Sequence, residues 1–164
     1  RGDITATLRV LLLDGLADGI SAPRFKRPVD YLVSSLRQLN AAVGSGDTLW
    51  DPLRRLGQLP FAWPTPDGYP DRDEAWSANL MPRWAFAWAL GNDALSAVAV
   101  NWASVCGDAL PLRESVDRLA TALFGASLPE AERDALVAEL PDEDLGTRKI
   151  LAAALLASPR FQWH

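Results

Sequence analysis

A loop in the middle of the chain constrains its fold more than any other feature. Residues 56–76 read LGQLPFAWPTPDGYPDRDEAW, in which four prolines stand among aromatic residues. Proline lacks a backbone donor and fixes φ, so this stretch can form neither a regular helix nor a central strand. It also contains too many aromatic residues for a linker that has no structural or binding role. We therefore expect a long ordered loop at about residues 57–76, whose rings are covered by the core, a ligand or a partner.

Composition narrows the class of protein. The chain has 164 residues, of which 49% are hydrophobic, enough for one domain with a real core. A formal net charge of −5 argues against a nucleic-acid-binding protein, because affinity for phosphate backbones comes mainly from clustered Lys and Arg. An acidic surface is also unsuited to anionic membranes, and no run of about 18 apolar residues occurs. We expect no nucleic-acid partner and no membrane insertion.

Cys106 and His164 are the only cysteine and the only histidine. A single cysteine excludes an intrachain disulfide and a thiolate zinc cluster, and Cys106 is most simply a small buried hydrophobic residue. His164 ends the chain, where backbones are usually frayed, so we expect neither histidine-ligated metals nor a Ser/His/Asp triad. The sequence contains no GxSxG, HExxH or Gly-rich phosphate loop and indicates no cofactor.

Apolar residues recur at helical spacing along most of the chain. The pattern predicts helices from Asp3 to near Gly19, from Pro28 to near Gly44, and at 50–56, 77–90, 93–106, 112–124, 128–140 and 142–158. Side chains suited to N-capping are placed near the starts of six of these helices: Asp3, Asp51, Ser77, Asp93, Ser127 and Asp142. No strong alternation and no hairpin signal appears. We predict an all-α bundle of about seven to eight helices, forming a single domain over residues 1–164.

Three unlike motifs follow one another along the chain. They are FKRPVDYLVSSLRQLN at 25–40, the loop at 56–76 followed by NLMPRWAFAWAL, and LLASPRFQ at 155–162. In this order they resemble the C-terminal part of the bacterial family known as domain of unknown function 1800, over nearly the whole chain. Members are usually much longer and many look exported, which implies that a large N-terminal portion is absent here. The family has no agreed reaction, so the resemblance transfers no catalytic residue.

The ends of the sequence support the same interpretation. The chain begins with Arg1, and its only methionine is Met81. We therefore expect a piece of a longer parent protein.

The aromatic residues of the central loop are the main candidates for a contact site. Flat rings are the surfaces on which sugars and apolar ligands stack, and the chain has seven tryptophans. Trp63 and Tyr69 are the best candidates, with Phe61 beside them. The alternative is that these rings plug the open end of the helical bundle, since large aromatic-rich loops usually pack by their own side chains.

Four carboxylates lie beside the same loop, those of Asp67, Asp71, Asp73 and Glu74. Such a group can supply calcium ligands or a paired acid and base, although the spacing is not that of an EF-hand. The simpler interpretation is structural. Asp67 precedes a glycine in a turn, and Asp73 and Glu74 approach a helix start, where negative charge is favourable.

Arg24, Lys26 and Arg27 form the one basic cluster, directly before the predicted helix start at Pro28. Positive charge at a helix N-terminus interacts unfavourably with the helix dipole, so a carboxylate or an acidic ligand is needed to balance it. We expect an intramolecular salt bridge or a docking contact rather than a phosphate site. We expect Arg83 to reach the acids of the loop in the same way.

Two hypotheses follow. The leading one is a noncatalytic helical module that docks or contacts a ligand through residues 58–76, with a contact set of Trp63, Tyr69, Phe61, Asp71 and Arg83. Its partner is the missing N-terminal portion of the parent protein or a second copy. The alternative is part of a secreted or periplasmic hydrolase acting on a polymer such as a polysaccharide, with loop carboxylates as acid and base and Trp63 as a stacking platform.

Overall fold

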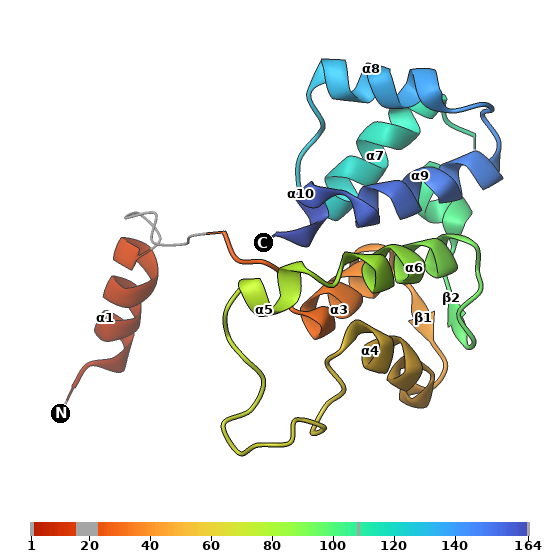
Figure 1. The fold of residues 1–164 in the computed structure, drawn as a ribbon. Helices are drawn as coiled ribbons and strands as arrows, with labels where there is room; N and C mark the ends of the chain where they lie inside the picture. The colour runs from red at the N-terminus through yellow and green to blue at the C-terminus, as the bar shows by residue number, and fades with distance from the viewer. Residues whose placement is uncertain (1, 16–22, 108, 164) are drawn as a thin grey trace.

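The computed structural model describes residues 2–15, 23–107 and 109–163 and is predominantly helical, which confirms the all-α class (Figure 1). The helices are α1 (Ile4–Arg9), α3 (Pro28–Gln38), α4 (Trp50–Leu56), α5 (Glu74–Ser77), α6 (Leu80–Gly91), α7 (Leu112–Phe124), α8 (Glu130–Glu139), α9 (Leu145–Ala157) and α10 (Pro159–Gln162). Two short antiparallel strands, β1 (Ala42–Val43) and β2 (Val98–Ala99), pair Ala42 with Ala99 and Val43 with Val98.

Helices α6 and α9 make the broadest contact in the bundle. Gly91 allows their close approach, since a Cβ there would lie 2.9 Å from the carbonyl oxygen of Lys149 and 3.0 Å from Cβ of Ala153. Helix α7 packs on α8 and α9, while α4 packs on α3 and α6. In Figure 1, α8 and α4 therefore lie at opposite ends of the stack.

The hydrophobic core lies between α3, α6, α7, α9 and α10. Its buried members include Tyr31, Leu32, Phe86, Leu90, Leu119, Leu151, Leu156 and Phe161. The ring of Tyr31 meets those of Phe86 and Phe161 edge to face, with centroid distances of 5.9 and 5.7 Å. Edge-to-face pairs add to the stabilisation that burial alone provides.

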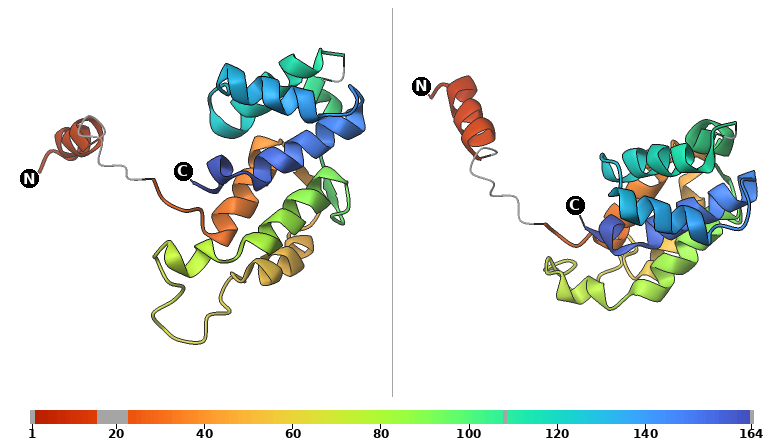
Figure 2. Two further views of the ribbon diagram at one scale, coloured as in Figure 1. Left: turned by 45° about the horizontal axis from the view of Figure 1, so that its top comes forward. Right: turned by 90° about the horizontal axis from the view of Figure 1, so that it is seen from above.

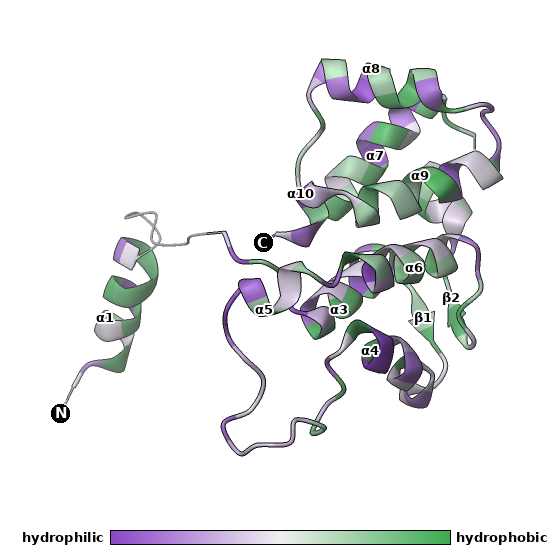
Figure 3. Cartoon of the chain, in the orientation of Figure 1, coloured by the Kyte–Doolittle hydropathy of each residue, from purple (hydrophilic) through white to green (hydrophobic). Residues whose placement is uncertain are grey.

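Helix α1 begins as predicted, because the carboxylate of Asp3 accepts a 3.1 Å hydrogen bond from the backbone N–H of Ala6. A π-helical turn, Val10–Asp14, continues it. No residue of either segment is buried, although both are rich in apolar residues, where the ribbon is green in Figure 3. Figure 2 shows α1 apart from the bundle in both views. The predicted end of this helix near Gly19 lies outside the described residues, as does His164.

The apolar segment 93–106 is not the buried helix that its composition predicts. Strand β2 occupies its middle, and only a π-helical turn, Ala103–Gly107, is helical near its end. Asp93, the predicted N-cap, lies in a turn with φ +54°. Its carboxylate accepts hydrogen bonds from the indole of Trp102, at 2.7 Å, and from Lys149. The prediction fails because tertiary partners occupy the oxygens that a cap would offer to the backbone.

Other predicted helix starts are displaced by a few residues, among them those of α6 and α9. Helix α6 begins after Asn79 rather than Ser77, and the Asn79 amide donates a 2.6 Å hydrogen bond to the carbonyl oxygen of Leu56. Helix α9 is capped by Asp144 rather than Asp142, with its carboxylate accepting from Thr147 N at 2.7 Å. Either aspartate fits the sequence pattern of an N-cap, so the choice depends on where the chain enters the bundle.

Candidate docking surface

The central loop packs on its own aromatic side chains. The ring of Tyr69 lies between those of Trp63 and Trp76, with centroid distances of 4.8 and 5.9 Å. The Tyr69 hydroxyl donates a 2.7 Å hydrogen bond to the carbonyl oxygen of Leu59, and the Trp76 indole donates to Pro70 at 3.0 Å. These contacts order a stretch that has almost no regular secondary structure.

The same loop leaves two rings accessible. Trp63 is 39% exposed, and Phe61 is completely exposed. Phe61 also has φ +61°, in the left-handed region that bulky residues seldom adopt. This conformation costs about 1–2 kcal/mol, and no burial of the ring offsets it. Phe61 is therefore the one aromatic residue of the loop whose position the fold of this chain does not explain.

The charged residues beside the loop pair with one another. Arg24 forms a 2.5 Å ion pair with Asp71, and Arg27 lies 3.8 Å from the same carboxylate and 3.2 Å from that of Asp30. The carboxylate of Asp73 accepts a 3.2 Å hydrogen bond from the backbone N–H of Phe25. The predicted intramolecular salt bridge of the basic cluster is confirmed.

Arg83 does not reach these acids, contrary to the prediction. Its side chain is fully buried, and it donates to the amide oxygen of Gln162 at 2.9 Å and to the backbone oxygen of Lys26 at 2.6 Å. The guanidinium lies 4.5 Å from the centroid of Phe25 and 5.0 Å from that of Tyr31. Burial lowers the pKa of Arg83 to about 10. Its contacts are those of a structural residue.

Arg83 joins segments that are far apart in sequence. The backbone N–H of Lys26 donates a 2.7 Å hydrogen bond to the carbonyl oxygen of Gln162, and Phe25 pairs with Trp163 in an isolated β-bridge. The rings of Phe25 and Trp163 meet edge to face at 5.3 Å. The three motifs noted in the sequence therefore meet around one guanidinium.

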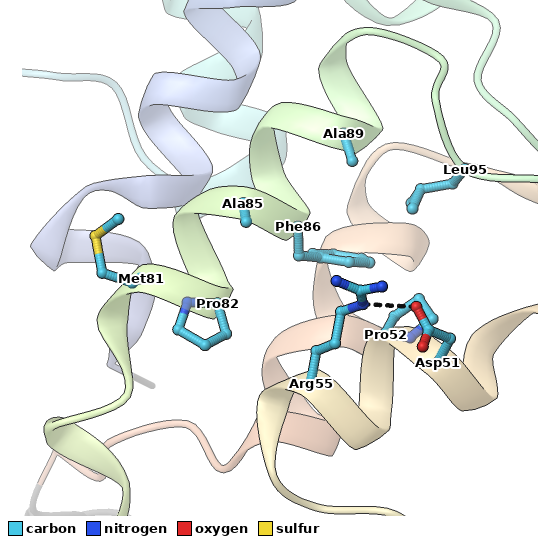
Figure 4. Close-up of a pocket in the computed structure, with 9 residues that line it drawn as sticks. All are labelled: Asp51, Pro52, Arg55, Met81, Pro82, Ala85, Phe86, Ala89 and Leu95. Carbon is cyan, nitrogen blue, oxygen red and sulfur yellow. Dashed lines mark hydrogen bonds and ion pairs between the residues drawn. The ribbon is translucent and has the colours of Figure 1, made fainter.

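A groove of about 650 Å³ opens between α4 and α6 (Figure 4). Its walls are mostly apolar, with Met81 and Pro82 toward one end, Ala89 and Leu95 toward the other, and Phe86 between them. The polar rim is an ion pair at 2.7 Å between Arg55 and Asp51. The sequence does not predict this groove, because its walls come from two helices that a long loop separates.

The outward side of α6 is also apolar. Met81 is 69% exposed, Trp84 46% and Trp88 56%. Their spacing of three and four residues places them on one stripe of the helix. The sequence does not predict which side of α6 is exposed, because the helix is apolar on nearly every side.

Acidic clusters and the cysteine thiol are the other groups that could carry chemistry. Within the described ranges, no group of three or more His, Cys, Asp or Glu side chains is arranged to hold a metal ion. Burial raises the pKa of Cys106 to about 11, which disfavours the thiolate needed for nucleophilic attack. None of the helices that the structure describes has the length and hydropathy needed to cross a membrane.

Fold and surface together define a helical module with an exposed aromatic loop and an apolar groove. The chain belongs to the family described as protein of unknown function (DUF1800), whose model matches residues 1–163. The resemblance drawn from the three motifs is thus confirmed. Neither the curated proteins nor the solved structures include a match to this chain.

Proposed function

We propose that this chain is a noncatalytic docking module that binds another polypeptide through the tip of its central loop and the α4–α6 groove. The observation that carries the proposal is Phe61, which is fully exposed in a strained backbone conformation. Strained conformations persist where surrounding structure imposes them and are concentrated at functional sites. Aromatic side chains are also the residues most enriched at the centres of protein interfaces.

The groove supports the same function. The loop runs from the end of α4 to α5 and α6, so the helices that form the groove also anchor the loop. Met81, Pro82 and Ala85 give the groove apolar walls on a helix whose neighbouring stripe is exposed as well. Contiguous apolar surface of this kind typically marks a binding site in a soluble protein.

The partner we propose is the N-terminal portion of a longer parent protein. The apolar residues of α1 lack buried contacts, and a docked polypeptide that covered both α1 and the groove would remove them from water. A second copy of the chain is the competing partner, and the experiment below separates the two.

No observation favours the hydrolase alternative. Asp71 is held by Arg24 and Arg27, and Asp73 accepts a hydrogen bond from the backbone of Phe25. The small hollow beside them, about 120 Å³ in volume, is lined mainly by charged side chains. A general acid would need apolar walls to raise the pKa of its carboxyl group.

The test is capture of the separately produced N-terminal portion, measured by size-exclusion chromatography with light scattering and by calorimetry. Phe61→Gly removes the exposed ring, and Ala85→Glu places a charge in the groove. We expect each variant to weaken capture at least about tenfold, the loss of one interface anchor, with an unchanged melting temperature. Ile150→Ala, on the exposed side of α9, is the matched control.

The outcomes separate the hypotheses. If the chain alone forms dimers and Ala85→Glu makes it monomeric, the partner is a second copy and not the N-terminal portion of the parent protein. The docking surface would be overturned if both the groove variant and the loop variant bound the N-terminal portion with wild-type affinity. It would also be overturned if the chain were a monomer that did not bind the N-terminal portion.

A further inference from the structure

Lys26 is a largely buried lysine whose ammonium has no counter-ion among the described residues. Its side chain is 6% exposed, and its ammonium makes no hydrogen bond or ion pair within that part of the chain. Its close contact is the ring of Phe161, whose centroid lies 3.6 Å from Nζ. The nearest influences on its charge are Arg83, which is also positive, and Asp30, which pairs with Arg27 at 3.2 Å. Partial burial of a charge is costly, and the face of one ring offsets only part of that cost, so the ammonium would gain from an anionic partner.

Lys26 lines a hollow of about 670 Å³ between α3, the end of α7 and α10. Arg160 is the second cation on its wall, while Ser34 and Gln38 of α3 supply neutral polar groups. No Asp or Glu belongs to the described lining. A hollow lined by cations in a protein of net charge −5 is suited to an anion.

The hollow also offers hydrogen-bond donors. Within the described chain, the Gln38 amide and the indole N–H of Trp163 make no hydrogen bonds, and Arg160 uses only Nη2, on Glu132 at 3.2 and 3.3 Å. The remaining donors of Arg160 and the Lys26 ammonium are available to an acceptor. Charge-assisted hydrogen bonds of this type are about twice as strong as neutral ones.

The charge balance favours a single negative charge. Lys26 and Arg160 contribute two positive charges, and Glu132 offsets one of them. The C-terminal end of α7, where Gly125 borders the hollow, adds the equivalent of about −0.5 charge. A monoanion therefore suits the hollow better than a phosphate dianion.

The rest of the wall is apolar and aromatic. Leu123 and Phe124 come from α7, and the ring of Trp163 is 44% exposed. Flat aromatic surfaces favour stacking with planar apolar groups. We propose that this hollow binds a small ligand with a carboxylate on a flat apolar body, with Lys26 and Arg160 holding the carboxylate and Trp163 covering the body.

Calorimetry with 2-naphthoate tests this proposal, with 2-naphthamide as the neutral isostere and inorganic phosphate as the dianion. We expect naphthoate to bind with a Kd of about 0.1–1 mM, in the range of a small fragment. Lys26→Met and Arg160→Met should each weaken binding about tenfold or more. Arg54→Gln removes an exposed positive charge outside the hollow and should leave the Kd unchanged.

A second measurement keeps the test informative even if Lys26→Met fails to fold. The chain has two lysines, Lys26 and Lys149, so reductive ¹³C-methylation gives two lysine signals. Naphthoate should move the Lys26 signal and raise its titration midpoint, because a bound carboxylate stabilises the charged form. The Lys149 signal, from an amine already paired with Asp93, should not move.

Several results would overturn the proposal. One is that naphthoate does not bind at about 10 mM, well above the expected Kd. Others are that the neutral amide binds as tightly as naphthoate, or that phosphate binds more tightly. Wild-type affinity of Lys26→Met for naphthoate would also overturn it. An unchanged Lys26 signal during saturation would also exclude this hollow as the binding site.

Discussion

The guanidinium of Arg83 donates a 2.6 Å hydrogen bond to the backbone carbonyl oxygen of Lys26, although each residue contributes a buried positive charge. Aromatic rings offset part of the cost of placing two cations here. Phe25 and Tyr31 lie beside the guanidinium, and Phe161 lies beside the ammonium. Attraction between a cation and a ring face is strongest where both are removed from water.

Replacing Arg83 should destabilise the bundle. Arg83→Met leaves the carbonyl oxygen of Lys26 and the amide oxygen of Gln162 without their donor, at a cost of about 2–4 kcal/mol in urea unfolding. Arg83→Lys should restore little, because an ammonium lacks the planar fork that reaches both acceptors. Arg54→Met, at an exposed arginine, should stay within about 0.5 kcal/mol of wild type. If Arg83→Met lowered the free energy of unfolding no more than Arg54→Met does, the structural role of Arg83 would be contradicted.

Gly91→Ala should loosen the contact between α6 and α9. The new Cβ would lie 2.9 Å from the carbonyl oxygen of Lys149. This oxygen belongs to the backbone of α9, so it cannot move away by a side-chain rotation. Overpacking of this kind costs about 1–3 kcal/mol and should appear as a lower melting temperature. Gly46→Ala meets no heavy atom within 4 Å and is the matched control. Equal stability of the two variants would show that the helices can separate freely.

Tyr69 should matter for the stability of the loop more than Phe61 does. Tyr69→Ala removes the ring between Trp63 and Trp76 and should cost about 2 kcal/mol, while Tyr69→Phe loses one hydrogen bond and about 1 kcal/mol. Phe61→Gly should cost almost nothing, because relief of about 1 kcal/mol of strain offsets the entropy of glycine. Thermal unfolding followed by tryptophan fluorescence measures all three. The reverse order of stabilities would mean that the Phe61 ring is buried in solution.

Lys26 should make stability rise with pH in the alkaline range. Burial, with a smaller effect of Arg83, lowers the pKa of Lys26 to about 8, whereas a solvated lysine titrates near 10.4. Between these values the unfolded chain binds more protons, so the free energy of unfolding increases with pH. The free energy of unfolding of wild type, measured relative to that of Lys26→Met, should therefore increase by about 1–2 kcal/mol from pH 8 to pH 10. Urea titrations at four pH values measure it, and a constant difference would show that Lys26 is solvated.

Helix α7 shows how far periodicity alone can predict. Leu112, Val116, Leu119 and Leu123 recur at helical spacing, and all four are buried on one face of the helix. Gly125, at φ +71°, ends it as expected. Segment 93–106 shows the limit. Its small apolar residues predict a buried helix, but Val98 and Ala99 pair with β1 and the indole of Trp102 donates to Asp93.

The candidate surface was predictable in part. Prolines and aromatic residues located the loop, but they could not separate Tyr69, which orders it, from Phe61, which it leaves exposed. That difference lies in tertiary contacts: Tyr69 packs between two tryptophans and bonds to Leu59, whereas Phe61 has φ +61° and a fully exposed ring. The α4–α6 groove was not predictable, because its walls belong to segments that only folding brings together.

The sequence by itself determined the helical class, most of the helices, the family and the position of the one long loop. These follow from local periods, from proline and glycine, and from motif order, all of which act over a few residues. Only the tertiary structure decided that Arg83 bonds to Lys26 and Gln162 rather than to loop acids, and that Lys26 faces a hollow lined without carboxylates among the described residues. Burial and hydrogen-bond partners depend on which helix faces meet, and local sequence patterns do not encode that pairing.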